Sequence, residues 1–194
     1  IMGIQEDANW LLNMVENLLS ITRIQNDNDG EAAHVKKTPE PLEEIVSSAV
    51  IRFQKRYPEG KINVKIPSDF LLVPMDPMLI EQVITNLLEN AWIHSGRKSD
   101  IDFLVRQEGD NVIFYVRDHG DGIEPEQMKH LFDGCAGVKN KETRKGMGIG
   151  LTICKTIIQA HQGWIQARNH EDGAEFYFSL PLEKENGGSK DDRI

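Results

Sequence analysis

The chain has 194 residues, of which 39% are apolar, and a net charge of −9 from 31 acidic and 22 basic side chains. This apolar fraction is sufficient for the core of one domain and excludes wholesale disorder. The acidic balance argues against nucleic acids and anionic membranes as partners, because both require basic patches on the protein.

The beginning of the chain has a pattern typical of a helix that packs against other helices. Between residues 6 and 25, apolar side chains recur at intervals of three and four residues, at Leu11, Met14, Leu18 and Ile21. The repeat is too short to separate a coiled coil from an ordinary core-facing helix, so both remain open. The turn-forming residues 26–30 predict a boundary. We expect the chain to be part of a longer protein, in which any membrane segment would precede these residues, because no apolar run here could cross a bilayer.

Helices and strands are expected to alternate through the rest of the chain. Helical periodicity covers residues 40–53, 77–93 and 150–161, and strand-like patterns cover residues 61–66, 70–73, 101–105, 112–118, 164–167 and 175–180. This order predicts an α+β fold, a two-layer α/β sandwich with helices on one face of a mixed sheet. We assign residues 28–40 to a linker and first strand, 41–182 to the main domain and 183–194 to a disordered tail.

The helix expected at 77–93 has a polar face beside its apolar one. Gln82, Asn86 and Asn90 recur every four residues, and Glu89 lies next to them. Amide oxygens and a carboxylate suit Mg²⁺, which prefers oxygen ligands and shares phosphate groups with the protein. A solvated polar face explains the same pattern and, for this helix alone, is the commoner case.

The strand expected at 112–118 ends in an aspartate. Every second residue is apolar and shares one face of the strand, as in Val112, Phe114 and Val116. Asp118 shares that face, where a carboxylate is costly unless it accepts a hydrogen bond, for example from the exocyclic amine of adenine. Gly120 and Gly122 would let the backbone turn tightly beside such a ligand. An ordinary turn at the end of a strand explains this motif equally well when it is taken alone.

A third motif precedes the helix that we expect to start near Leu151. Gly146, Gly148 and Gly150 would expose backbone amides next to a helix N-terminus, which is a favourable site for an anion. Their spacing fits neither the Rossmann nor the Walker pattern. The long irregular segment before them is typical of a lid, and its residues Arg144 and Lys145 are expected to approach phosphates.

In the order Asn86–Ala91, Asp118–Gly122 and Gly146–Leu151, the three motifs resemble the boxes of the catalytic, ATP-binding domain of two-component sensor histidine kinases. The resemblance covers residues 34–182, and two segments, 41–45 and 144–151, look closest to potassium-responsive kinases of the KdpD type. It implies a Bergerat or GHKL-type fold, with residues 1–27 as the second helix of a dimerisation and histidine-phosphotransfer domain. It further implies ATP and Mg²⁺ as cofactors, a homodimeric parent, a response-regulator receiver domain as partner and a cytoplasmic location for this domain.

The resemblance also implies roles for individual residues. Asn90 and Asn86 would meet Mg²⁺, and Asp118 would hold the adenine amine. The residues expected to contact ATP are Asn86, Glu89, Asn90, His94, Asp118, Gly120, Gly122, Ile123, Phe132, Arg144, Lys145, Gly146, Met147, Gly148, Ile149, Gly150 and Leu151. No residue is assigned a catalytic role.

Four positions depart from the pattern of the family. Ile93 stands where a lysine is common, Cys135 where the lid has its second aromatic residue, Gly137 where a basic residue follows, and Ala174 where many members have threonine. These changes concern lid closure and phosphate binding more than adenine binding. They keep open the alternative of a pseudokinase that binds nucleotide only as a conformational signal.

No histidine of the chain stands in the motif that carries the phosphoacceptor of the family. We therefore expect Mg-ATP to bind here, and the γ-phosphoryl group to pass to a histidine outside this chain and then to an aspartate of a response regulator. A serine kinase of the anti-sigma type is a further alternative, which the pair Ile93–His94 supports. Those relatives usually have glutamate where this chain has Asn86.

Overall fold

The computed structural model describes residues 35–133 and 147–182, together with residues 8, 11–12, 15–20, 22 and 24. Five strands form the main sheet: β2 (Ile62–Lys65), β4 (Ile101–Glu108), β5 (Asn111–Arg117), β6 (Ile165–His170) and β7 (Gly173–Pro181). Their order across the sheet is β2-β4-β5-β7-β6. Only the β2–β4 pair is parallel within this sheet, so the prediction of a mixed sheet is confirmed.

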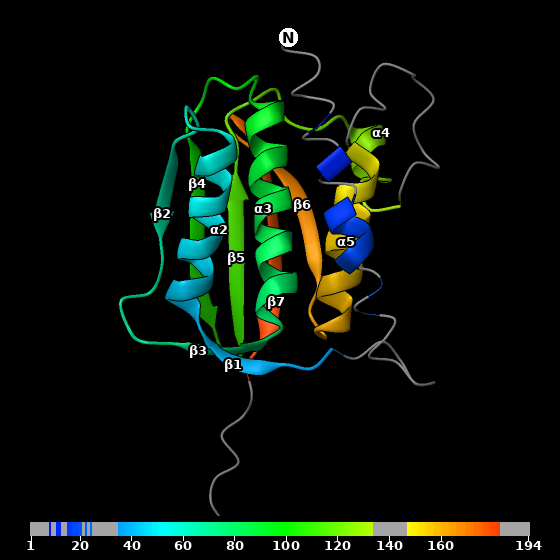
Figure 1. The fold of residues 1–194 in the computed structure, drawn as a ribbon. Helices are drawn as coiled ribbons and strands as arrows, with labels where there is room; N and C mark the ends of the chain where they lie inside the picture. Colours follow the sequence, from blue (N-terminus) through cyan, green and yellow to red (C-terminus); the bar gives the residue numbers. More distant parts are fainter. Residues whose placement is uncertain are drawn as a thin grey trace, which may run out of the picture.

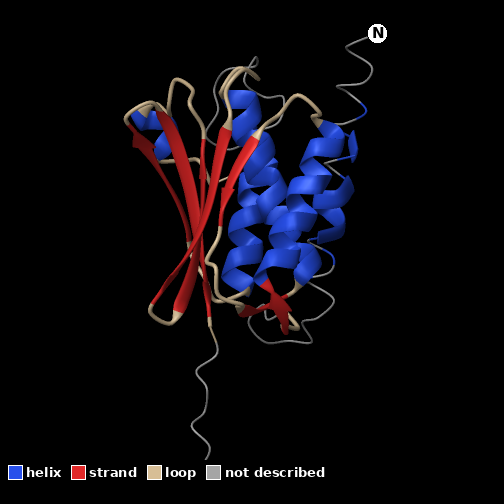
Figure 2. Cartoon of the chain, turned by 90° about the vertical axis from the view of Figure 1, so that its left-hand side faces the viewer, coloured by secondary structure: helices blue, strands red, loops and turns tan. Residues whose placement is uncertain are grey.

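Three long helices cover one face of this sheet (Figures 1 and 2). They are α2 (Leu42–Arg56), α3 (Pro77–His94) and α5 (Met147–Ala160). A small antiparallel sheet of β1 (Thr38–Pro41) and β3 (Leu72–Met75) lies at one end of the helical layer (Figure 1). The short helix α4 (Pro125–Met128) follows β5 in the chain. This arrangement confirms the predicted two-layer α/β sandwich, and no helix in the described residues has the length and hydrophobicity needed to cross a membrane.

The helix α3 forms the centre of the helical layer because its sequence supplies both a start signal and an apolar face. The Asp76 side chain accepts hydrogen bonds from the backbone amides of Met78, at 3.0 Å, and Leu79, at 3.1 Å, and Pro77 opens the helix. Its fully buried side chains face the sheet, among them Ile80, Val83, Ile84, Leu87 and Leu88. The helix therefore holds the asparagine motif in a fixed orientation.

The strand β5 is built as its sequence predicts. Val112, Phe114 and Val116 are all buried, and the ring of Phe114 stacks on that of Phe178 in β7 with centroids 4.5 Å apart. The intervening Tyr115 lies on the other face, where it stacks on Tyr177. This alternation directs the side chain of the next residue in phase, Asp118, toward the helical layer.

Two local expectations are corrected, and one short helix was not predicted. The helix α5 begins at Met147 rather than near residue 150, because a glycine inside a helix costs only about 1 kcal/mol relative to alanine and the apolar residues continue the helical pattern. The strand predicted at 70–73 is β3 at 72–75, and Phe70 remains 78% exposed. The short helix α4 had no periodic signal of its own, since it has four residues.

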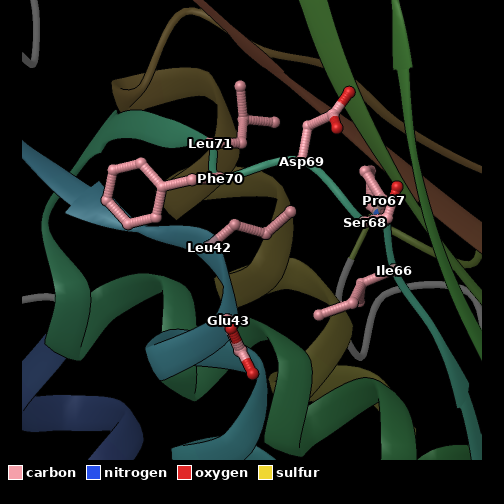
Figure 3. Close-up of a pocket in the computed structure, with 8 residues that line it drawn as sticks. All are labelled: Leu42, Glu43, Ile66, Pro67, Ser68, Asp69, Phe70 and Leu71. Atoms are coloured by element: carbon pink, nitrogen blue, oxygen red, sulfur yellow. The ribbon is translucent and has the colours of Figure 1, made fainter.

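The loop between β2 and β3 forms a small hollow with the start of α2 (Figure 3). Its volume is about 120 Å³, and its lining residues are Leu42, Glu43, Ile66, Pro67, Ser68, Asp69, Phe70 and Leu71. The exposed Phe70 belongs to this loop, and β3 begins two residues after it.

The described residues between 8 and 24 are helical and pack against the main domain on an unexpected side. Leu11 and Leu18 of the predicted apolar stripe are more than half exposed, whereas Asn17 and Ile24 are buried. Met14 and Ile21 lie outside the described residues, as does the tail predicted at 183–194. The apolar stripe thus has no partner among the described residues of this chain. The domain boundaries stay predictions.

Candidate functional site

Asp118 follows the last residue of β5 and is 2% exposed. Its Oδ1 atom accepts hydrogen bonds from two backbone amides, those of Gly120 at 3.0 Å and Ala174 at 3.1 Å. Its Oδ2 atom has no donor among the described residues. Every fully buried polar side-chain atom of these residues has a hydrogen-bond partner, so the unpaired Oδ2 is not fully buried and keeps some contact with solvent. The carboxylate is therefore fixed by one oxygen and offers the other to a donor from outside.

The loop from Asp118 to Ile123 approaches α3 very closely. A Cβ atom at Gly120 would lie 2.6 Å from the carbonyl oxygen of His94, at the end of α3, so only glycine fits there. Gly122 has a φ angle of +76°, which glycine adopts without the cost that other residues have. The two glycines predicted for a tight turn are thus required, one for its contact and the other for its conformation.

The hairpin of β6 and β7 supports this loop with residues that the sequence analysis missed. Asn169 binds the backbone of Ile123, and His170 lies with its Nε2 atom 2.8 Å from the carbonyl oxygen of Asp118. His119 lies between Asp172, at 2.8 Å, and Asp102, at 3.1 Å. The hydrogen bond to Asp172 is the main cause that raises the pKa of His119 above its usual value of 6.5. No local pattern signals these contacts, because the partners are far apart in the sequence.

The side-chain amides on the polar face of α3 form hydrogen bonds with each other and with the N-terminal helical residues. Gln82 donates through Nε2 to Oδ1 of Asn86 at 2.9 Å, and Asn86 donates through Nδ2 to Oδ1 of Asn17 at 3.2 Å. Nδ2 of Asn86 also lies 3.8 Å from Sγ of Cys154 in α5, where burial raises the pKa of the thiol to about 12. Asn86 is therefore held at the junction of α3, α5 and the N-terminal helical residues.

Asn90 and Glu89 have different surroundings from Asn86. Asn90 is half-buried, and its side chain makes no hydrogen bond to another described residue, so its amide is available to a ligand. Glu89 is buried and forms an ion pair with Arg56 of α2. This ion pair directs the carboxylate of Glu89 toward α2, and its role in nucleotide binding stays a prediction.

The glycine-rich motif lies beside the asparagine motif, where the structure describes it. Gly150 faces Asn86, since a Cβ on this glycine would lie 3.9 Å from the amide carbon. Leu151 is buried and Ile149 is partly exposed. For Met147 and Gly148 the structure describes the helical backbone alone. Arg144, Lys145 and Gly146 lie outside the described residues, as do Cys135 and Gly137 of the predicted lid. Phe132, which precedes this segment, packs edge-on against Phe176 with ring centroids 6.4 Å apart.

These residues fit a magnesium nucleotide. Asp118 offers a carboxylate oxygen, Gly120 lets the backbone come close, and Asn90 offers an amide oxygen. Within the described residues, no group of three His, Cys, Asp or Glu side chains could hold a metal ion by itself. A Mg²⁺ ion that uses amide oxygens, water and phosphate oxygens together agrees with this donor set.

Comparisons with known proteins agree with this geometry. Residues 75–184 match the family described as histidine kinase-, DNA gyrase B- and HSP90-like ATPase. The chain is 42% identical over 186 residues to the sensor protein KdpD of Clostridium acetobutylicum, which covers 94% of this chain and 20% of that protein. It is 36% identical over 169 residues to the sensor protein KdpD of Escherichia coli, with coverages of 87% and 18%.

A solved structure gives the same result at the level of the fold. The catalytic domain of histidine kinase ThkA superposes with a TM-score of 0.67 at 27% identity, covering 76% of this chain and 96% of that domain. The chain spans about a fifth of the length of the two sensor proteins. It belongs to the family of histidine kinase-, DNA gyrase B- and HSP90-like ATPases, and its fold is that of a histidine kinase catalytic domain.

Proposed function

We propose that this chain is the ATP-binding catalytic module of a sensor histidine kinase similar to the KdpD type. It binds Mg-ATP, and the γ-phosphoryl group passes to a histidine outside this chain and then to an aspartate of a response-regulator receiver domain. The observation that carries this proposal is the Asp118 carboxylate, buried and fixed through Oδ1, with Oδ2 open to an incoming amine.

Each box has a separate task in this proposal. Asp118 accepts a hydrogen bond from the adenine amine, and the backbone at Gly120 lies along the base. Asn90 and Asn86 would offer amide oxygens to Mg²⁺, and the residues from Arg144 to Leu151 would lie along the phosphates. Bound Mg²⁺ neutralises phosphate charge. The protein then acts by positioning and electrostatic stabilisation, as phosphoryl transfer generally requires.

The wider setting is part of the proposal. The exposed stripe with Leu11 and Leu18 supports a homodimeric parent, in which a second helical pair would cover it. A response regulator is the partner that the relay requires. A membrane location of the parent would come from regions beyond this chain, and the domain itself would lie on the cytoplasmic side.

The rival enzyme class is a serine kinase of the anti-sigma type. Such a kinase needs a carboxylate to activate its nucleophile, and this chain has Asn86 at the corresponding position. The nearby Glu89 forms an ion pair with Arg56, which argues against it as a substitute. These two facts favour the histidine kinase. The pseudokinase alternative rests on Ile93, Cys135 and Gly137, and a transfer assay decides it.

The test is calorimetric titration of the chain with ATP, with and without Mg²⁺. Asp118→Asn should weaken ATP binding roughly ten- to a hundredfold, because it removes the charge that the adenine amine meets. Asp110→Asn, at the turn before β5, makes the same change at the other end of that strand and should leave the affinity unchanged. Equal affinities of the wild-type chain and Asp118→Asn would contradict the proposal.

A second assay separates an active kinase from a pseudokinase. The chain is mixed with radiolabelled ATP and a separately supplied helical hairpin that carries a phosphoacceptor histidine. Label on the hairpin supports the kinase, whereas Mg-ATP binding without transfer supports the pseudokinase.

A further inference from the structure

The loop from Asp118 to Ile123 is fastened at both of its ends by one distant hairpin. At its start, the amide of Asp118 donates to the carbonyl oxygen of Ala174 at 3.0 Å, and the amide of Ala174 donates back to Oδ1 of Asp118 at 3.1 Å. At its end, Ile123 is bound by Asn169. Ala174 and Asn169 are directly opposite each other in the β6–β7 register. One rigid pair of strands therefore determines where both ends of the loop lie.

Asn169 binds Ile123 with both halves of its side-chain amide. Oδ1 accepts from the backbone amide of Ile123 at 2.8 Å, and Nδ2 donates to the carbonyl oxygen of the same residue at 2.8 Å. Two short hydrogen bonds from one planar group fix the orientation of the backbone as well as its distance. The side chain of Asn169 thus pairs with both the backbone N–H and the backbone C=O of Ile123, as a neighbouring strand does in a sheet.

The backbone conformation and the small size of Gly122 both allow the contact between Asn169 and Ile123. Its φ angle of +76° turns the chain so that Ile123 presents its amide and carbonyl groups to Asn169. A Cβ at Gly122 would lie 3.0 Å from Oδ1 of Asn169, which is closer than the side chain tolerates without shifting. A residue with a side chain at position 122 would therefore disturb the contact twice, through its conformation and through its volume.

We propose that Asn169 is a positioning residue for base recognition. By holding Ile123, it keeps the backbone of the Asp118–Ile123 loop in the plane and at the distance that an adenine base requires, and it does so without touching the nucleotide. This inference rests on the proposed function, because it assigns the means by which the same pocket selects its base.

The test compares three variants by calorimetric titration with ATP and with GTP. Asn169→Ala removes both hydrogen bonds and should weaken ATP binding about tenfold, with a smaller effect on GTP, so that the ATP:GTP ratio falls. Asn169→Asp keeps the shape but replaces the donor by a carboxylate oxygen that faces the carbonyl oxygen of Ile123, and should lose as much. Gln166→Ala is the control, since Gln166 lies on the same strand and its side chain bonds, among the described residues, to the hydroxyl of Tyr177 and not to the loop.

The readouts separate positioning from folding. A partly unfolded variant lowers the number of binding sites per chain, whereas a mispositioned loop lowers the affinity of each site and the base preference. ATP affinity and ATP:GTP ratio equal to those of Gln166→Ala in both Asn169 variants would overturn the inference, while Asp118→Asn still weakened binding and the proposed function stood. Failure of the wild-type chain to bind ATP would instead overturn the proposed function, and the inference with it.

Discussion

Single glycines decide how closely the strands and loops of the site can approach each other. A Cβ at Gly173, the first residue of β7, would lie 2.2 Å from the carbonyl oxygen of Asp118. No side chain fits in this space, and the neighbour is backbone, which cannot rotate away. The position of the Asp118 carboxylate thus depends on Gly173, a residue without a side chain that lies more than 50 positions away in the sequence. The hydrogen bond between Asp118 and Ala174 shows the same dependence on this segment.

Gly173→Ala should therefore reduce both stability and nucleotide binding. We expect a loss of at least about 2 kcal/mol in the free energy of unfolding, from overpacking against backbone, and a clear loss of ATP affinity. Gly109→Ala is the matched control, because Gly109 has a φ of +60° and open space around it. It should lose about 1 kcal/mol with unchanged affinity. Urea unfolding and calorimetry measure both quantities, and wild-type affinity in Gly173→Ala would refute the prediction.

Among the elements, the N-terminal helical residues and α3 make the contact with the clearest consequence for ligand binding. Asn17 accepts hydrogen bonds from Gln82 at 3.3 Å and from Asn86 at 3.2 Å. The oxygen of Asn86 accepts one hydrogen bond from Gln82, which leaves its second lone pair free. If the amide of Asn86 turns to bring this oxygen to Mg²⁺, its Nδ2 atom leaves Asn17, so we expect docking of the N-terminal helical residues and binding of the metal to oppose each other.

Asn17→Ala should strengthen ATP binding in the presence of Mg²⁺. Removing an acceptor worth about 1 kcal/mol releases Asn86, so the affinity should increase about fivefold. Without Mg²⁺ the affinity should stay unchanged. Ser20→Ala is the control, because the hydroxyl of Ser20 donates to the backbone of Glu16 in its own helical segment and, within the described part of the chain, to no other residue. Calorimetry in the two conditions tests this, and a gain that is equal with and without Mg²⁺ would show that Asn86 is not the group released.

The same elements show what the sequence can predict. The helix α3, the strand β5 and the burial of Asp118 follow from periodicity and end signals that lie within a few residues of each other. The partners of the loop do not, because Asn169 and His170 meet it only after β7 has paired with β5 and β6. The ion pair of Glu89 with Arg56 on α2 is likewise not indicated by its position along the helix beside the asparagines, because its partner is 33 residues away in the sequence.

For the molecule as a whole, two histidines make stability depend on pH in opposite directions. His161 is fully buried, donates from Nδ1 to the carbonyl oxygen of Ile157 at 2.7 Å and accepts from the amide of Asp76 at 3.0 Å. Burial lowers its pKa from 6.5, so its contribution is complete above pH 6.5 and is lost as the pH falls below this value. The pKa of His119 is raised, mainly by Asp172, so its contribution is complete below pH 6.5 and is lost as the pH rises.

We expect His161→Gln to flatten the loss of stability on acidification. Glutamine does not titrate, so the fall in the free energy of unfolding between pH 7.5 and pH 5.5 should shrink by up to about 1.4 kcal/mol relative to the wild-type chain. His119→Gln should do the opposite and make the fall larger. Urea unfolding at the two pH values measures the difference, and an unchanged slope in His161→Gln would contradict the assignment of a neutral, buried imidazole.

The strand order has a consequence for how this domain is made. The strand β7 is the last of the described strands in the sequence, yet it lies between β5 and β6 in the sheet (Figure 1). During synthesis on the ribosome, the edge of β5 that pairs with β7 therefore stays unpaired until residues 173–181 have emerged. Asp118 can accept the amide of Ala174 only after that, so we expect the site to be incomplete until nearly all of the described domain has been synthesised.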